Sequence, residues 1–271
     1  QMRLVYELKT NRSAMKRSLL FLSLLSVVAL SACKKESPEQ PSDTLEVAEK
    51  NSVLIAKHTW TGCGPCGGWG FDNFATLMQD FPDEVHVAFK RGGVGPYQNN
   101  EIYDFFQNTF EIPGATPTFH NNLDAGISVN LAKESMESQG VIANANYEMT
   151  LENNRIVLKT TTKFFQDAEG TYRIAPYLIL DGIIANQTGH PDGANTEHKK
   201  VPIDIAKPID AANSNFIGYV IADGSIHSGY TVNLECEVAA DPSWDPNNIS
   251  FALMIFKDHG NGSYSLINTF T

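Results

Sequence analysis

Two cysteines separated by two residues are the part of this sequence with the clearest chemistry. Cys63 and Cys66 enclose Gly64 and Pro65, and they follow an apolar run at residues 53–60 that predicts a buried strand. Apolar residues then recur at helical spacing over 71–81. Because the start of a helix carries unpaired N–H groups and a partial positive charge, it lowers the pKa of a thiol placed there. The spacing therefore predicts a dithiol that opens and closes reversibly.

The positions of the two cysteines predict different roles in thiol exchange. Exchange proceeds by attack of a thiolate on a disulfide sulfur through a mixed disulfide. Cys63 at the helix start is the expected nucleophile, and Cys66, one turn further in and more buried, is the expected resolving thiol. The predicted partners are thiols and disulfides of proteins or peptides. No metal and no cofactor are expected beyond the redox-active Cys63–Cys66 disulfide.

The paired cysteines are also compatible with a zinc site or with a merely structural disulfide. Such a pair can be half of a zinc site, but the sequence has no second pair of this spacing, and His58 and His120 stand at no recurring ligand spacing. A structural disulfide stays open as well. Cys236 alternates in phase with the apolar residues of 230–238 and is expected to be a buried, unreactive thiol. His58 could tune a thiol pKa, although a hydrogen-bonded core histidine is the commoner outcome.

The elements around the pair predict a small α/β domain over residues 45–139. A second strand is expected at 85–90, and a helix at about 99–110 follows a glycine-rich loop. A short strand at 116–119, a turn at 121–122 and a helix at about 130–138 complete the unit.

The chain changes character after Gly140. Alternating runs separated by Asn-Asn, Glu-Gly, Asp-Gly and Gly-Asn-Gly turns predict seven or so strands, at 141–151, 155–165, 171–184, 216–222, 230–239, 249–256 and 264–270. Short strands without a strong helix predict an antiparallel, Ig-like β-sandwich over 140–271. The polar segment 189–215 is expected to be a surface loop with one short strand near 201–205.

The N-terminal region predicts export and lipidation. From Met15 a basic start and twelve apolar or small residues at 19–30 precede Cys33, which is typical of a secretory signal and too short to span a membrane. The ending Leu30-Ser31-Ala32-Cys33 resembles a bacterial lipobox, which implies lipidation of Cys33 and loss of residues 1–32, upstream residues included. Residues 33–44 are assigned to a lipidated tether. The whole of 34–50 has the Pro-, Ser-, Glu- and Lys-rich composition of a flexible segment.

The motifs together resemble the thioredoxin superfamily. The resemblance rests on the strand, the Cys-Gly-Pro-Cys tetrapeptide, the helix, and Thr116-Pro117-Thr118 entering a strand. It implies that Pro117 is a cis-proline beside the thiols and that Thr116 offers its backbone to an extended substrate. Gly64 and Pro65 shape the motif, and Trp60 is the nearest preceding aromatic residue. Lys57 departs from the family at the spacing where a buried acid often assists the second thiol.

Taken whole, residues 33–271 resemble the 28-kilodalton outer-membrane lipoprotein family of Gram-negative anaerobes, with a YLxxDGI run at 177–183 and a WDPxN segment at 244–248. The resemblance implies a protein anchored to the outer membrane, on a side left open. We expect a thiol:disulfide oxidoreductase or isomerase. The alternative is a surface binding or adhesion lipoprotein that uses the fold as a scaffold. A net charge of −11 excludes a broad basic face for nucleic acid, and the oligomeric state is not predicted.

Overall fold

Three strands form a mixed sheet, and the predicted redox motif follows the C-terminal end of its central strand. The computed structural model describes residues 44–93, 100–213 and 215–271. Strand β1 (Leu54–Trp60) lies in the centre, parallel to β2 (Val85–Arg91) and antiparallel to β3 (Thr118–Asn121). Both predicted strands, 53–60 and 85–90, are confirmed. Their apolar composition follows from burial on two faces, because helices cover one side and further elements cover the other.

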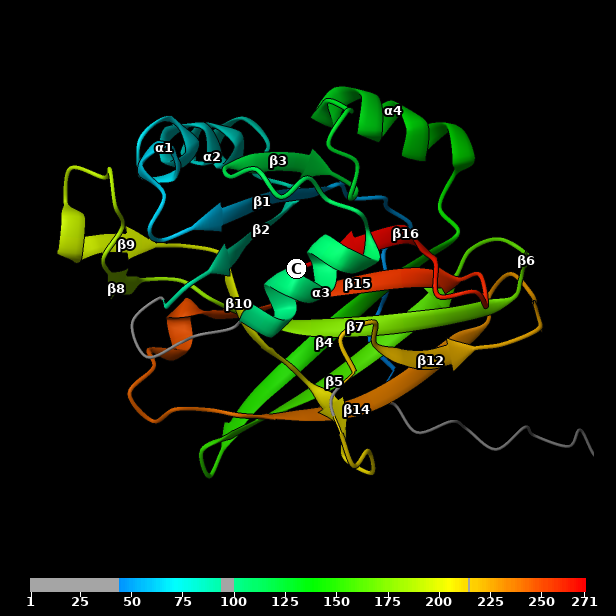
Figure 1. Cartoon of the computed structure of the whole chain (residues 1–271). Coiled ribbons are helices and arrows are strands. Elements are labelled where there is room, and N and C mark those ends of the chain that lie inside the picture. Colours follow the sequence, from blue (N-terminus) through cyan, green and yellow to red (C-terminus); the bar gives the residue numbers. More distant parts are fainter. Residues whose placement is uncertain (1–43, 94–99, 214) are drawn as a thin grey trace, which may run out of the picture. The chain divides into compact units, whose positions relative to one another are not determined.

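Four helices accompany this sheet. They are α1 (Gly64–Gly67), α2 (Trp69–Asp80), α3 (Asn100–Thr109) and α4 (Val129–Gln139). Val53 and Ile55 pack with Val129 and Met136 of α4, and Leu77 of α2 joins this cluster. Helices α2 and α4 therefore cover one face of the sheet, while α3 lies on the other (Figure 1).

Two larger antiparallel sheets follow in the chain. The five-stranded sheet contains β7 (Thr171–Leu180), β10 (Val201–Ile205), β12 (Tyr219–Ala222), β15 (Ile249–Asp258) and β16 (Tyr264–Phe270). The four-stranded sheet contains β4 (Ala143–Glu152), β5 (Arg155–Phe164), β11 (Lys207–Pro208) and β14 (Thr231–Ala239). Strands are thus present in all seven predicted runs.

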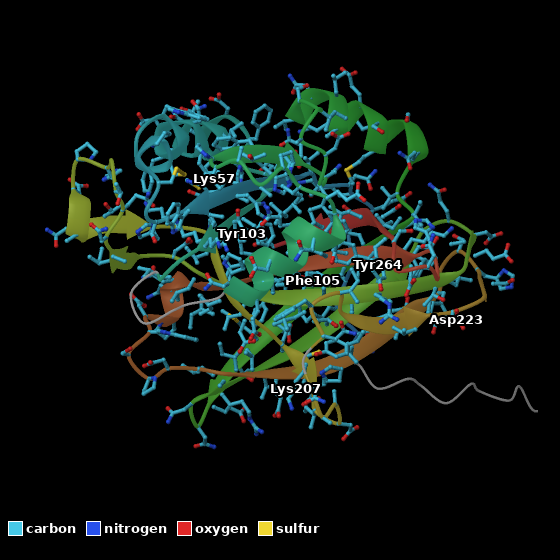
Figure 2. All side chains as sticks on the ribbon, viewed as in Figure 1. Lys57, Tyr103, Phe105, Lys207, Asp223 and Tyr264 are labelled. Atoms are coloured by element: carbon cyan, nitrogen blue, oxygen red, sulfur yellow. A yellow bond between two sulfur atoms is a disulfide. The ribbon has the colours of Figure 1, made fainter. Side chains whose placement is uncertain are left out.

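Strands β7 and β15 are buried on both faces. Leu178 and Phe251 point into the core shared with the four-stranded sheet. Tyr177 of β7 and Met254 of β15 lie on the opposite face of these strands and pack instead with β1, β2 and α3. Figure 1 shows the resulting order of layers: helices, the three-stranded sheet, the five-stranded sheet and the four-stranded sheet. The α/β part and the β part consequently share one of the molecule's cores, which includes Tyr103 of α3, labelled in Figure 2.

The segment after β7 is more ordered than its polar sequence suggested. It holds β8 (Ile183–Ala185), the turn η1 (Gly193–Asn195) and β9 (Thr196–His198) before β10 begins. Thr196 and His198 are fully buried. The short strand expected near 201–205 is confirmed as β10. The surface loop expected around it is wrong at 196–198, because Thr196 and His198 are buried and the His198 ring contacts Phe71 of the α/β part. The remaining short elements are β6 (Ala168–Glu169), β13 (Ser225–Ile226) and η2 (Pro246–Asn248).

The end of the expected flexible segment is also held in place. Leu45 donates its backbone N–H to Thr161 of β5, and Asn146 and Asn144 of β4 donate to the carbonyl oxygens of Glu46 and Ala48. The expectation that residues 45–50 are flexible is therefore wrong, because polar side chains on the outer face of the four-stranded sheet bind the backbone of this segment. Residues 1–43, which include Cys33 and the predicted signal, lie outside the described residues.

Most of the described structure is β-sheet, distributed over several sheets, with few helices. Among the described residues, no helix combines the length and the apolar character needed to cross a membrane. The boundary drawn at 139/140 stays a prediction, although the chain does pass there from α4 into β4.

Candidate redox site

Cys63 and Cys66 form a disulfide at the end of β1. Their sulfur atoms are 2.08 Å apart. Cys63 is the N-cap of α1, and its Sγ accepts the backbone N–H of Cys66 at 3.2 Å. Cys63 is half-buried whereas Cys66 is fully buried. An N–H group that donates to sulfur stabilises a thiolate more than a thiol. The geometry therefore distinguishes the two sulfurs in the sense expected from the sequence.

The helix after Cys63 is shorter than predicted. The first piece, α1, ends at Gly67, and Gly68 separates it from α2 with φ −88° and ψ −117°. Pro65 occupies the first turn of α1, where its missing N–H costs no hydrogen bond. The helical stretch at 71–81 is confirmed, but it belongs to a second helix that begins at Trp69.

Thr116 and Pro117 lie beside the disulfide. The peptide bond between them is cis, as the resemblance implied. The Sγ of Cys63 is 3.5 Å from the carbonyl oxygen of Thr116, a contact rather than a hydrogen bond because a disulfide sulfur carries no proton. Gly70 of α2 approaches the proline ring so closely that a Cβ there would lie 2.5 Å from the Cγ of Pro117. Gly70 thus allows α2 to pack against the Thr116–Pro117 loop.

A loop of the β part contacts the backbone that leads to Cys63. Gln187, fully buried between β8 and η1, directs its Nε2 to the carbonyl oxygens of Trp60, Thr61 and Cys63 at 3.2–3.3 Å. The N–H of Thr188 donates to the same Thr61 carbonyl at 2.9 Å. These contacts join the 187–190 loop to the turn that presents Cys63.

The same loop explains why Gly67 stands in helix α1, although glycine is unfavourable for helix formation. A Cβ on Gly67 would lie 2.2 Å from the carbonyl oxygen of Thr188, and one on Gly189 would lie 2.2 Å from that of Gly64. Backbones that approach this closely require glycine. Sequence reasoning missed Gln187, Thr188 and Gly189, since a polar QTG tripeptide carries no distinguishing motif.

Exposed aromatic side chains flank the motif. Trp60 is 48% exposed and Trp69 is 52% exposed, which is unusual for residues of this size. The Trp60 ring also packs over Gly62, where a Cβ would lie 2.8 Å from it. The Trp69 ring faces Phe119, two residues after Pro117, with centroids 6.3 Å apart. The surface beside the disulfide therefore offers apolar contacts.

His58 and His120 pair with each other in the core. His58 Nδ1 lies 2.6 Å from His120 Nε2, and the His58 ring packs between Phe89 and Tyr103. Burial lowers the pKa of His58 to about 2 and that of His120 to about 4, so both are neutral. His58 is thus a hydrogen-bonded core histidine, the commoner of the two outcomes weighed from the sequence.

Lys57 lies on β1, six residues before Cys63. It is 2% exposed, and its Nζ is 3.5 Å from the carbonyl oxygen of Gly70. The ammonium also lies over the rings of Phe71 and Phe74, at 5.0 and 4.6 Å from their centroids. Desolvation lowers the pKa of Lys57 to about 7. The side chain can therefore exist with or without its proton near neutral pH.

Cys236 lies far from the site in the core between the two large sheets. It is fully buried and free, and burial raises the pKa of its thiol to about 12. The expectation of an inward core thiol is confirmed.

No family model and no curated protein matches this chain. Solved structures do: HBP35 of Porphyromonas gingivalis aligns with a TM-score of 0.62 at 16% identity, over 83% of this chain and 76% of that one. A protein of Agrobacterium tumefaciens aligns with a TM-score of 0.48 at 12% identity, over 82% of this chain and 95% of that one. A domain of the outer membrane lipoprotein Omp28 of P. gingivalis aligns with a TM-score of 0.27 at 11% identity, over 48% and 85%. The first alignment shows a shared fold, whereas TM-scores below 0.5 are too low to infer one.

Proposed function

We propose that this chain is a thiol:disulfide oxidoreductase or isomerase of the cell envelope, with a thioredoxin-like part followed by an Ig-like β-sandwich. The observation that carries the proposal is the position of the Cys63–Cys66 disulfide: Cys66 is fully buried, whereas Cys63 is only half-buried and its sulfur lies 3.5 Å from the Thr116 carbonyl oxygen beside Pro117. This arrangement sets the less buried cysteine next to backbone groups that an extended peptide can pair with, which a purely structural disulfide does not require.

The exchange reaction uses only the two sulfurs and the substrate. In the reducing direction the Cys63 thiolate attacks a substrate disulfide, a mixed disulfide forms, and one substrate sulfur leaves as a thiolate that takes up a proton. Cys66 then loses its proton and attacks the Cys63 sulfur, which releases the second substrate thiolate. The Cys63–Cys66 disulfide is restored, and two electrons have passed to the substrate. Oxidation is the same sequence in reverse. In isomerisation another thiolate of the substrate attacks the mixed disulfide, which forms a new substrate disulfide and releases Cys63 as a thiolate.

The flanking groups support binding of an unfolded or extended partner. Trp60 and Trp69 provide exposed apolar surface on either side of the motif. Thr116 is half-buried, and only Pro117 separates it from strand β3. A peptide strand alongside 115–117 would place its cysteine near Cys63.

Trapping of the mixed disulfide tests the reaction. A Cys66→Ser variant, incubated with a peptide that contains one internal disulfide, should accumulate a covalent adduct on Cys63 that mass spectrometry detects. Cys63→Ser is the matched control and should form none. Wild-type protein should in addition accelerate the reduction of insulin by dithiothreitol. Absence of both adduct and acceleration would refute the exchange reaction and favour the scaffold role of a surface binding lipoprotein.

We further propose lipid attachment at Cys33, which rests on the lipobox alone. Cys33→Ser should leave the fold intact and move the protein from the membrane fraction to the soluble fraction, because a tether separates the anchor from the described residues. Retention of the variant in the membrane fraction would show that another segment holds it there.

A further inference from the structure

The face of the three-stranded sheet beneath α2 carries buried lysines where apolar side chains are the rule. Ile55 and Lys57 lie on the same face of β1, because side chains alternate along a strand. Lys90 lies on this face of β2, since its neighbour Phe89 packs on the opposite face with α3. Lys57 is 2% exposed and Lys90 is 5% exposed. Figure 2 shows Lys57 beneath α1 and α2.

Neither lysine has a carboxylate partner among the described residues. Glu197 and Asp192 are the nearby acids, but Glu197 lies 3.6 Å from Lys199 and Asp192 lies 3.7 Å from His190. Both acids are solvent-exposed. Two buried atoms nearby in the described part of the chain, Thr59 Oγ1 on β1 and His198 Nδ1, have no hydrogen-bond partner, whereas Lys57 Nζ has only the Gly70 carbonyl oxygen at 3.5 Å. A buried ammonium without a counter-charge is costly, so such a lysine either loses its proton or gains an anionic partner.

A cavity opens onto the two lysines. Its volume is about 270 Å³. The wall formed by α2 is apolar and consists of Phe71, Phe74, Ala75 and Met78. The rim formed by the 190–199 segment is polar and consists of His190, Asp192, Glu197 and Lys199. The cavity therefore combines an amine floor, an apolar wall and a mouth that reaches solvent.

We propose that this cavity binds a small amphipathic anion, whose carboxylate or similar acidic group pairs with Lys57 and Lys90 while its apolar body packs against Phe71, Phe74 and Met78. The cavity is lined by neither cysteine, and the proposal does not depend on disulfide exchange. An acidic head group supplies the counter-charge that the two lysines lack, and an apolar body removes the apolar wall of the cavity from contact with water. Both buried groups on the floor are amines, which favours an anionic over a cationic head group there.

Binding should be coupled to proton uptake. Desolvation lowers the pKa of Lys57 to about 7 and that of Lys90 well below its ordinary value. The charge of Lys57 also lowers the pKa of Lys90, and both lysines lower the pKa of His198. A bound anion favours the charged amines, so protons are taken up on binding and affinity falls as the pH rises above 7. The titratable groups that face the two lysines come from β2 and from the 190–199 segment; they are His86, His190, Asp192, Glu197, His198 and Lys199.

Calorimetry with 4-phenylbutyrate tests the proposal. The neutral amide of the same acid and inorganic phosphate serve as separate probes for the apolar body and for the head group. The wild-type protein should bind the acid at least tenfold more tightly than either comparison compound. Titrations at pH 8 in two buffers of different ionisation enthalpy should reveal net proton uptake.

Variants locate the site. Lys57→Met and Lys90→Met replace buried amines by apolar side chains of similar length, and each should weaken binding of 4-phenylbutyrate at least tenfold without affecting the amide. Lys257→Met, on β15 of the five-stranded sheet, is the matched control and should bind as wild type. The proposal is overturned if the acid and the amide bind equally, if phosphate alone binds as tightly as the acid, if neither lysine variant weakens binding, or if no probe binds at millimolar concentration.

Discussion

Gly67 lies against Thr188 at backbone distance: a Cβ on Gly67 would be 2.2 Å from the Thr188 carbonyl oxygen. Gly67 is the last residue of α1, and Thr188 belongs to the loop that follows β8. The predicted redox motif is therefore enclosed on one side by the β part of the chain. In this arrangement the 187–190 loop takes part in fixing the position of Cys63.

Replacement of Gly67 tests this contact. Gly67→Ala should lower the free energy of unfolding by about 1–3 kcal/mol, because the added methyl group overlaps the backbone of the loop and forces α1 to shift. Gly64→Ala is the matched control, since a Cβ at that position has no neighbour within 4 Å. Urea unfolding monitored by circular dichroism measures both. Equal stability of the two variants would contradict the close packing of α1 against the loop.

Gln187 should act as a positioning residue for the turn before Cys63. Its Nε2 carries two N–H groups and lies 3.2–3.3 Å from three carbonyl oxygens, those of Trp60, Thr61 and Cys63, which share these two donors. In Gln187→Glu a carboxylate would face those oxygens, whereas Gln187→Ala only removes the donor. We expect Gln187→Glu to be the more damaging and to lower the free energy of unfolding by about 1–3 kcal/mol.

A readout at the disulfide separates positioning from stability alone. The equilibrium constant of the Cys63–Cys66 disulfide in glutathione buffers should change in both Gln187 variants, since the turn is free to move once its donor is lost. An unchanged constant in both variants would show that Gln187 supports the fold without positioning the motif.

Local patterns in the sequence predicted the elements well. The apolar run of β1 and the alternating runs of β4, β5 and β14 have clear periods, and turn residues mark their ends. The cis bond before Pro117 followed from the family resemblance. What local patterns cannot express is contact between distant segments, so the approach of Gln187 to Cys63 was not foreseen.

Two further features could not be predicted for the same reason. Strands β7 and β15 are apolar on both faces because each separates two cores, a fact that depends on which sheet covers them. Lys90 lies near the end of the apolar strand β2, where a lysine normally marks exposure, yet α2 and the 190–199 segment cover it. Burial of a single polar residue is set by such tertiary cover, and buried groups that break the local pattern are commonly functional.

The three cysteines of the described chain should differ in reactivity once the disulfide is reduced. Cys63 is half-buried, whereas Cys66 and Cys236 are fully buried. Because burial raises the pKa of Cys236 to about 12, its thiolate is scarce at neutral pH. Iodoacetamide at pH 7 should modify Cys63 at least about 100-fold faster than either of the others, as measured by peptide mass spectrometry. Similar rates for Cys63 and Cys66 in the native protein would reverse or remove their assigned roles.

Lys57 should make the stability of the protein depend on pH. Its pKa is lowered by burial from 10.5 in the unfolded chain to about 7 in the folded one. Between these pH values the unfolded state binds more protons, so the free energy of unfolding of the wild type should rise as the pH increases from about 7 to 10.5. Below pH 7 Lys57 is protonated in both the folded and the unfolded state, and burial of its ammonium group in the folded state lowers the free energy of unfolding.

Lys57→Met removes this contribution. The variant should be more stable than the wild type by about 1–4 kcal/mol at pH 6.5, and the difference should shrink at pH 9.5. Part of the pH dependence should remain, because burial also lowers the pKa of Lys90. Urea unfolding at the two pH values measures the effect, with Lys257→Met as the control that leaves the pH dependence unchanged. If Lys57→Met and the wild type differ by the same amount at both pH values, Lys57 does not titrate near neutrality, and the energetic cost assigned to its burial beneath α2 is wrong.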